Sequence, residues 1–277
     1  YGVRAVEDIA KQVNGYVDKY NLDFIGFPDD NFAVSKKRVA EFPKVFKEFG
    51  LEDMRWGTHT RMDEADSRIF DMSESGCVYI GFGAESASEH TLTVMKKGGF
   101  ILKNGMVTKN VNGSEYQFPK TMVDAIVNCK DANIHPNCTW IMAYPGEDLR
   151  HLQTSAAFIL WQREFWTKGL TPGTAMYDNA YAAVNSRMFT ATAYPGTEMW
   201  NVVKPKLQKH FDISFDFLGN PVCDENFHRY VLELDDATKV LNDKNGNPVN
   251  FGEMPLDTFL QAREHIDNDK IEKVLEL

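Results

Sequence analysis

The chain has 277 residues, of which 43% are apolar, and this fits one large domain or two small ones with a sizeable core. Its formal net charge of -10 at pH 7 argues against general binding to nucleic acid backbones or anionic membranes. The sequence contains no apolar run of about 18 residues, the length that a membrane-spanning helix needs.

The four cysteines are too widely spaced to form a local metal site. They are Cys77, Cys129, Cys138 and Cys223, and none of them pair at CxxC or CxxxC spacing. The sequence therefore predicts no metal ligands within the chain. Buried free thiols are typical of a reducing compartment, and we expect the protein in the cytoplasm.

The first part of the chain alternates between helical and strand patterns. Apolar residues at helical spacing predict a helix over 6–20, and a short apolar strand follows within 22–32. Ser35 is the expected N-cap of the next helix, which Gly50 should end. The following elements are expected in order: a strand at 54–62, a helix at 66–75, a strand at 77–86 and a helix at 88–97.

The segment 98–118 interrupts this alternation. It is rich in Gly and Asn, and its Asn-Gly pairs at 104–105 and 112–113 predict an inserted hairpin. Beyond it we expect a helix over 119–133, a strand within 135–147, a long helix to 168, a strand within 186–200 and one charged C-terminal helix over 256–277.

Strands and helices that alternate with crossovers of this length predict parallel βα units. Strands of such sheets are expected to be buried on both faces, and the apolar runs "DFIGF", "VYIGF" and "TWIMAY" fit that expectation. The ligand site of such a fold lies at the carboxyl ends of the strands.

Polar residues follow several of the predicted strands at that end. They are Asp29 and Asp30, then His59 and Arg61, then Glu85 and Ser86, then Tyr144 to Glu147. Carboxylates can accept hydrogen bonds from an ammonium group or a ribose diol, and an arginine can pair with a carboxylate through two hydrogen bonds. The pattern therefore suits a zwitterionic ligand that also carries hydroxyl groups.

The same positions also have structural explanations. Asp29 or Asp30 is typical of a turn cap, and His59 of a rim or packing residue. Glu85 stands where a helix dipole favours an acid. Glu147 and Glu198 are expected to be helix caps for the same reason.

Five motifs together give a resemblance to a known family. They are "FPDDNF", "THTRMD", "ESGCVYIGFGAESASEHTLTVMKKG", "WIMAYPGE" and "AYPGTEMW", within residues 1–205. In order and spacing the chain resembles the radical S-adenosylmethionine (SAM) enzymes, and most of all the branch that often carries an upstream cobalamin-binding domain. The resemblance implies an α/β fold: a partial TIM-type (β/α) barrel that lacks its first strand, over residues 1–210. The hairpin 98–118 would be inserted in it, and a C-terminal extension, 211–277, would pack on it.

The resemblance also implies roles for individual residues. Glu85, with Ser86 beside it, matches the position that binds the ribose hydroxyls of SAM. Asp29 or Asp30 matches the acid that holds the amino group of SAM, and Arg61 matches a partner of its carboxylate. Met142 or Tyr144 would lie against adenine. No catalytic side chain is assigned.

The family's CxxxCxxC motif, which holds a 4Fe–4S cluster, does not occur in this chain. "YGVRAVEDIA" resembles the segment just after that motif, so we expect the cluster ligands upstream of residue 1 and the fragment alone to be inactive. In the intact enzyme, the resemblance implies that an electron donor such as flavodoxin or ferredoxin reduces the cluster. SAM then yields a 5′-deoxyadenosyl radical that abstracts hydrogen. With cobalamin, methyl transfer is a natural outcome, although the chain shows no recognisable cobalamin motif.

The sequence alone is also compatible with two other interpretations. One is a TIM-barrel metal-dependent hydrolase or lyase that uses Asp29, Asp30, His59 and Glu85 as ligands. The other is a truncated, non-catalytic binding module.

Overall fold

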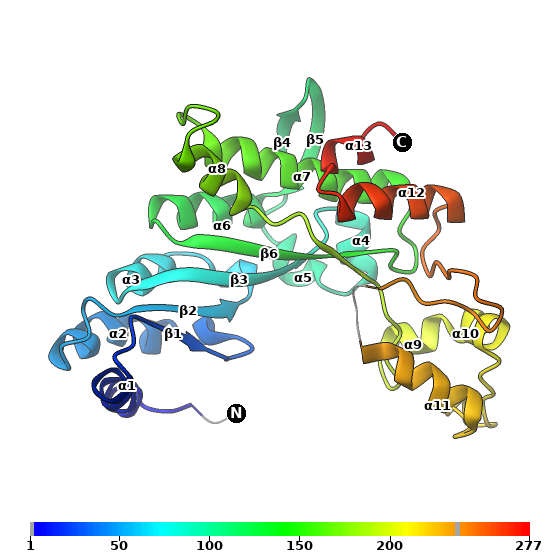
Figure 1. Cartoon of the computed structure of the whole chain (residues 1–277), viewed down its shortest axis with the longest axis horizontal. Coiled ribbons are helices and arrows are strands. Elements are labelled where there is room, and N and C mark those ends of the chain that lie inside the picture. Colours follow the sequence, from blue (N-terminus) through cyan, green and yellow to red (C-terminus); the bar gives the residue numbers. More distant parts are fainter. Residues whose placement is uncertain (1–2, 236–238) are drawn as a thin grey trace.

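A five-stranded parallel sheet organises the computed structural model, which describes residues 3–235 and 239–277 (Figure 1). Tyr1 and Gly2 of the segment "YGVRAVEDIA" lie outside the described residues. The predicted parallel α/β fold is confirmed, with neighbouring strands in the order β1-β2-β3-β6-β7. The strands are β1 (Phe24–Phe27), β2 (Arg55–Thr60), β3 (Cys77–Glu85), β6 (His135–Met142) and β7 (Met188–Thr190).

Helices connect these strands, and local sequence signals explain where they begin and end. The side chain of Ser35 accepts a hydrogen bond from the backbone N–H of Arg38, and Gly50, with a φ of 68°, follows the same helix. These helices are α1 (Val6–Tyr20), α2 (Lys36–Glu48), α3 (Arg68–Glu74), α4 (Glu89–Val94), α5 (Gly98–Ile101), α6 (Lys120–Asp131), α7 (Leu149–Thr167) and α8 (Ala175–Ala182), with short 3-10 turns at η1 (Phe32–Val34) and η2 (Met62–Glu64).

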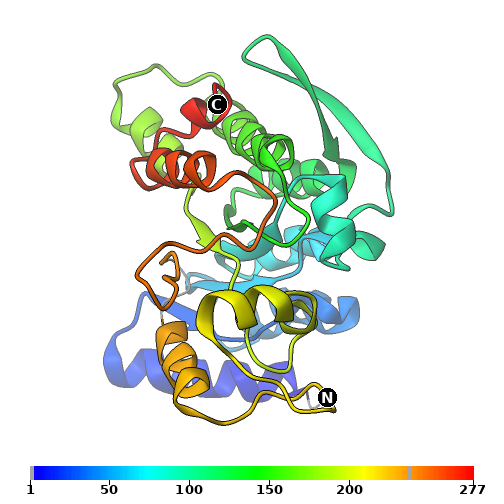
Figure 2. The ribbon, with the colours of Figure 1, turned by 90° about the vertical axis from the view of Figure 1, so that its right-hand side faces the viewer.

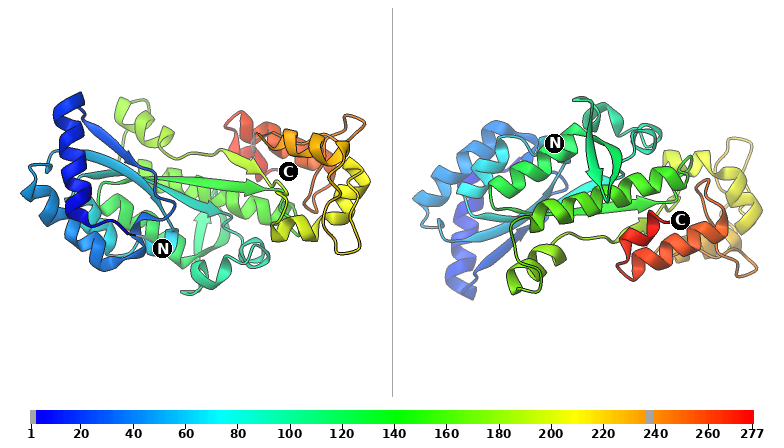
Figure 3. Two further views of the ribbon diagram at one scale, coloured as in Figure 1. Left: turned by 90° about the horizontal axis from the view of Figure 1, so that it is seen from below. Right: turned by 90° about the horizontal axis from the view of Figure 1, so that it is seen from above.

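Helices cover only one face of the sheet. Along β6 the side chains that point toward the helices are buried, whereas the alternate ones, from His135 to Ile141, are only half-buried. In Figure 3, α7 lies in front of β6 in the view from above, and β6 lies in front of α7 in the view from below. The expectation that the strands are buried on both faces is therefore wrong. The second face is lined by polar side chains and glycines because it borders a pocket.

The segment after α5 contains an antiparallel hairpin that projects from the body of the molecule (Figures 1 and 2). Its strands are β4 (Met106–Val111) and β5 (Ser114–Pro119). The buried ring of Phe118 anchors the hairpin, since its centre lies 5.1 Å from that of Phe158 and 6.2 Å from that of Trp161, both on α7.

A second, smaller hydrophobic cluster lies beyond β7, on the side of the sheet where the strands end (Figure 1). It includes Trp200 and Tyr230, and the Tyr230 hydroxyl donates a hydrogen bond to the carbonyl of Ala193 at 2.8 Å. Its helices are α9 (Glu198–Val202), α10 (Lys204–Phe211) and α11 (Glu225–Leu232), followed by η3 (Glu233–Asp235).

Two loops of this region repeat one motif, D-x-x-G-N-P-V, at 216–222 and 243–249. In each loop the aspartate carboxylate accepts hydrogen bonds from the backbone two and four residues later, and the glycine has a φ near 80°. Each loop closes a short antiparallel bridge.

The C-terminal segment returns to the main core as two helices, α12 (Leu256–Asp267) and α13 (Ile271–Val274). The prediction of one helix over 256–277 is therefore wrong. Asp269 has a φ of 54°, in the left-handed region, which ends the first helix. The Asp269 carboxylate also accepts a hydrogen bond from Arg163 of α7 at 2.5 Å, which fixes the break against the core.

Within the part of the chain that the structure describes, none of the helices is both long and apolar enough to cross a membrane.

Candidate functional site

A pocket of about 590 Å³ lies over the uncovered face of the sheet, near the carboxyl ends of β1, β2 and β3. This volume is within the range of about 300–1,000 Å³ that is usual for small-molecule sites. Asp29, Asp30, Arg61 and Glu85 all line this central pocket. The structure therefore brings together four of the residues that the sequence singled out.

The loop that carries the two aspartates is fixed by its neighbour, Asn31. The Asn31 side-chain oxygen accepts hydrogen bonds from the Thr60 hydroxyl at 2.7 Å and from the backbone N–H of Arg61 at 3.3 Å. Asp29 and Asp30 are exposed and line the pocket. The contact of Asn31 with the end of β2 thus places both carboxylates at the pocket rim, where they can meet a cationic ligand group.

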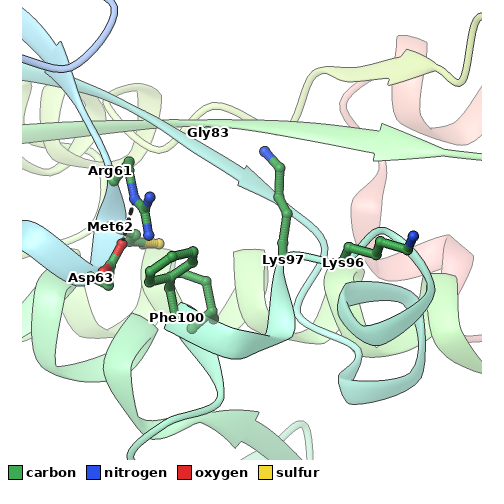
Figure 4. Close-up of a pocket in the computed structure, with 8 residues that line it drawn as sticks. Arg61, Met62, Asp63, Gly83, Lys96, Lys97 and Phe100 are labelled. Carbon is green, nitrogen blue, oxygen red and sulfur yellow. Dashed lines mark hydrogen bonds and ion pairs between the residues drawn. The ribbon is translucent and has the colours of Figure 1, made fainter. Parts of the chain in front are cut away.

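Arg61 is held by two contacts (Figure 4). Its Nε donates a hydrogen bond to the Asp63 carboxylate at 2.9 Å, and its guanidinium carbon lies 3.8 Å from the centre of the Phe100 ring. Asp63 is nearly buried, and Lys103 lies 3.7 Å from its other oxygen. The guanidinium is therefore oriented before any ligand binds.

Glu85 ends β3 with a φ of 63°, which is uncommon for a residue with a side chain. Its Oε1 accepts a hydrogen bond from Lys97 Nζ at 2.5 Å. The carboxylate lies over the bare backbone of Gly83, where a Cβ would stand 2.7 Å from that same oxygen. The glycine therefore makes the room in which the Glu85–Lys97 pair sits.

The other predicted residues lie around this pocket but differ in exposure. Ser86 is buried, and its hydroxyl lies 3.1 Å from that of Ser155 on α7. Met142 is fully buried, on the helix-covered face. Tyr144 lines an adjoining, mostly apolar pocket that also contains Glu85 and Ile141, and burial raises the pKa of its hydroxyl. The structure thus places Tyr144 near Glu85 and turns Ser86 and Met142 into the interior.

Glu147 is not the helix cap that the sequence suggested. Asp148 caps α7, with a capping box to His151, whereas Glu147 is fully buried. Glu147 Oε2 accepts a hydrogen bond from the backbone N–H of Ala143 at 2.6 Å, and Oε1 has no hydrogen-bond partner among the described residues. Burial raises the pKa of Glu147 to about 8. The prediction that Glu147 is a helix cap is wrong because the turn that contains it folds inward, under the segment around Gly252.

The pocket wall also carries neutral polar groups that were not among the residues predicted from the sequence. Asn137 donates a hydrogen bond to the Tyr79 hydroxyl at 2.6 Å, and the Thr139 hydroxyl donates to the carbonyl of Phe82 at 3.3 Å. His59 packs where Gly81 lacks a side chain, since a Cβ there would lie 2.4 Å from the ring. The alternation of polar and apolar residues in "HPNCTWIM" was the signal that could have revealed Asn137 and Thr139.

Residues 3–235 and 239–277 contain no group of three His, Cys, Asp or Glu side chains that could hold a metal ion. Cys77, Cys129 and Cys138 are buried, and burial raises the pKa of Cys77 and Cys138 to about 12. Thiols with such values do not ionise readily, so they are poor cluster ligands. The described residues thus do not fit a 4Fe–4S cluster, nor a metal ion bound by His59 and the neighbouring acids.

The central pocket as a whole combines acids, two cations and neutral hydrogen-bonding groups at one edge of the sheet. The exposed aspartates suit an ammonium group, Arg61 suits a carboxylate, and the Glu85 carboxylate suits a diol. The chemistry available here is the binding and orientation of a zwitterionic ligand with hydroxyl groups.

Searches with protein-family models found no match to the chain. Among curated proteins, it is 26% identical over 198 residues to an uncharacterized methyltransferase of Pyrococcus horikoshii, a match that covers 71% of this chain and 35% of that protein. It is also 25% identical over 108 residues to the anaerobic magnesium-protoporphyrin IX monomethyl ester cyclase of Cereibacter sphaeroides, which covers 38% of this chain and 18% of that protein. The chain thus spans about a third or less of the curated relatives that it matches.

Among solved structures, the fold is similar to that of the radical S-adenosylmethionine methyltransferase TsrM from Kitasatospora setae, determined with tryptophan substrate and a SAM analog bound. The TM-score is 0.53 at 13% sequence identity, and the match covers 99% of this chain and 46% of that one. The sequence motifs indicated a resemblance to enzymes of this kind, and the structural similarity shows that the fold is shared.

Proposed function

We propose that the central pocket binds SAM and that this chain is the SAM-binding core of a radical SAM enzyme. The position of Glu85 is the observation that supports the proposal most strongly. Glu85 ends β3 with a backbone conformation that is rare for non-glycine residues, and its carboxylate lines the pocket. Gly83 leaves room for this carboxylate because it has no side chain. Non-glycine residues held in the left-handed region cluster at ligand sites.

The described residues fit the chemical groups of SAM. The Glu85 carboxylate would accept hydrogen bonds from the ribose hydroxyls, and Asp29 or Asp30 would hold the amino group. Arg61 would pair with the carboxylate. Tyr144 would lie against adenine in the adjoining pocket.

Ser86 and Met142 have supporting roles in this proposal because both are buried. The Ser86 hydroxyl lies 3.1 Å from Ser155 and also accepts a hydrogen bond from the backbone N–H of Ser88, which joins the end of β3 to α7. Met142 would lie behind the backbone that borders adenine. We therefore assign ligand contact to Tyr144 and packing to Met142.

A 4Fe–4S cluster, in this proposal, would be held by cysteines outside residues 1–277, because the described residues do not fit it. The cluster would supply the electron that cleaves SAM to a 5′-deoxyadenosyl radical. The chain's own contribution is to bind and orient SAM and to keep water from it.

The proposed enzyme transfers a methyl group with the help of cobalamin, and a flavodoxin or ferredoxin supplies the electron. The support for methyl transfer is the relationship to the Pyrococcus horikoshii methyltransferase and the fold shared with TsrM. Neither gives this chain a substrate. We place the protein in the cytoplasm.

The architecture proposed for residues 1–210 is the partial (β/α) barrel of the radical SAM core, lacking its first strand. The parallel order β1-β2-β3-β6-β7 and the one-sided helix cover support it, because a barrel wall has helices outside and a pocket inside. The segment 98–118, which contains most of the hairpin β4–β5, is an insertion in this wall, and 211–277 is the extension.

Calorimetric titration of SAM into the intact protein, reconstituted with its cluster, tests the proposal. Wild type should bind SAM, and Glu85→Gln should bind it about tenfold or more weakly, since the charged acceptor contributes about 1.5–3 kcal/mol. Lys120→Gln is the matched control, because it removes a 2.5 Å ion pair with Asp124 on the surface of α6. Equal affinity of wild type and Glu85→Gln would contradict the proposal.

A further inference from the structure

The sheet face that borders the central pocket is arranged in rows, because residues in register on neighbouring parallel strands lie side by side. One row, here called the inner row, consists of His59 of β2, Gly81 of β3 and Asn137 of β6, and all three line the pocket. Gly83, over which the Glu85 carboxylate lies, is two residues closer to the carboxyl end of β3. The inner row therefore lies roughly 6.6 Å deeper along the strands than the groups proposed to hold SAM.

The depth of the pocket differs from its rim in charge. The inner row contains no carboxylate, ammonium or guanidinium group, and neither does the row below it, which consists of Gly57, Tyr79 and His135. An ion placed here would lose hydration without gaining a side chain of opposite charge, whereas an uncharged polar group needs only hydrogen-bond partners. The inner row therefore suits an uncharged ligand group.

The carboxamide of Asn137 is held from one side and open on the other. Its Nδ2 donates a hydrogen bond to the Tyr79 hydroxyl at 2.6 Å, and the Tyr79 ring centre lies 5.7 Å from that of His135. The Asn137 oxygen and its second N–H make no hydrogen bond to the described residues, and the side chain is half-buried in the pocket wall. Asn137 thus offers one acceptor and one donor in a single plane.

The imidazole of His59 leans across the row toward that carboxamide. It fills the space over Gly81, since a Cβ there would stand 2.4 Å from its Cδ2 and 2.8 Å from its Nε2. Gly81 lies between His59 and Asn137 in the row, so the ring extends toward the strand that carries the carboxamide. The ring nitrogens of His59 make no hydrogen bond to the described residues, and a neutral imidazole supplies one donor and one acceptor.

We propose that the inner row binds an amide group of the substrate, either a carboxamide or a ring lactam, and that Asn137 determines this specificity. The Asn137 oxygen accepts the N–H of the substrate amide, and its second N–H donates to the amide carbonyl, so that two parallel hydrogen bonds form. His59 contacts the same group from the side of β2. This inference rests on the proposed function, since it assigns the substrate class to the part of the pocket that the partners of SAM leave open.

The test compares benzamide with acetophenone, which has the same ring and carbonyl group but no N–H donor. Both probes are uncharged, and ligand-observed NMR titration of the intact protein measures their dissociation constants. Wild type should bind benzamide about fivefold or more tightly than acetophenone. Asn137→Leu should reduce this preference to less than about twofold, whereas Asn137→Asp, which keeps an acceptor oxygen, should retain it. Asn179→Leu is the matched control, because Asn179 is exposed on α8.

Equal affinity of wild type for the two probes, or a preference that survives in Asn137→Leu, would overturn the proposal. Asn137→Ala provides the same test if the leucine variant does not fold. A parallel titration with SAM separates this inference from the proposed function. A wild type that binds no SAM but prefers benzamide would support the amide subsite while the proposed function fails. Displacement of benzamide by SAM would place SAM itself on the inner row and overturn the inference.

Discussion

Glu85 is the last residue of β3 and Glu147 lies in the turn that follows the neighbouring strand β6, and the structure gives the two glutamates opposite environments. Glu85 is partly exposed, pairs with Lys97 and lines the pocket. Glu147 is fully buried, has no ion-pair partner among the described residues and accepts a hydrogen bond from the backbone of Ala143. Both turns contain a non-glycine residue with a φ of 63°, Glu85 itself and Ala143.

The comparison shows that position at a strand end does not decide what a carboxylate does. Burial and the available partner decide it. A charged carboxylate with an ammonium partner at a pocket can bind a ligand, whereas a buried one with backbone partners is favoured in its neutral form and holds a turn.

The largest expected effect comes from removing the buried glutamate. Glu147→Ala leaves the N–H of Ala143 without its acceptor and opens a cavity, so we expect the free energy of unfolding to fall by about 2–4 kcal/mol. Urea denaturation monitored by circular dichroism measures this change. A loss below about 1 kcal/mol would show that the turn does not depend on the carboxyl group.

The second largest effect is expected in the pH dependence of stability, to which Glu147 should contribute. Burial raises the pKa of Glu147 to about 8 in the folded protein, above its value in the unfolded chain, about 4.3. The folded state therefore binds the proton more tightly, and this contribution to stability is fully present below about pH 4.3 and is lost as the pH rises toward 8.

Glu147→Gln has no such titration and serves as the reference. Relative to it, wild type should lose up to about 1.4 kcal/mol of stability per pH unit between pH 5 and pH 8. Urea denaturation of both proteins at several pH values measures the difference. Parallel pH profiles would mean that Glu147 is ionised in the folded protein.

Glu85→Gln should show the reverse pattern, with weaker SAM binding, by about tenfold, and little change in stability. Its ion pair with Lys97 is partly exposed, and such pairs contribute about 0–1 kcal/mol. Denaturation and SAM titration on the same preparations separate the two effects. A large loss of stability would place Glu85 with Glu147 as a structural residue.

The smallest effect concerns the glycine beneath Glu85. In Gly83→Ala the new Cβ would stand 2.7 Å from Glu85 Oε1 and displace it, so we expect SAM affinity to fall several-fold. Gly26→Ala is the control on β1, because a Cβ there has nothing within 4 Å. If both alanines bind SAM equally well, the position of the Glu85 carboxylate is not set by Gly83.

The sequence predicted the parallel sheet and placed four residues at one pocket, because strand ends and glycine turns depend on local chemistry. It did not predict that one face of the sheet is open, since "VYIGF" has the same apolar character whether helices cover one face or both. It also misassigned Glu147, whose burial depends on the distant segment around Gly252. Lys97 was overlooked because its contact with Glu85 joins residues on different elements.

A crystal structure of the intact protein with S-adenosylhomocysteine would show directly whether Glu85 binds the ribose of the ligand. We expect the ribose hydroxyls within about 3 Å of the Glu85 carboxylate and the amino group beside Asp29 or Asp30. A nucleoside bound elsewhere, with Glu85 still paired only to Lys97, would contradict it.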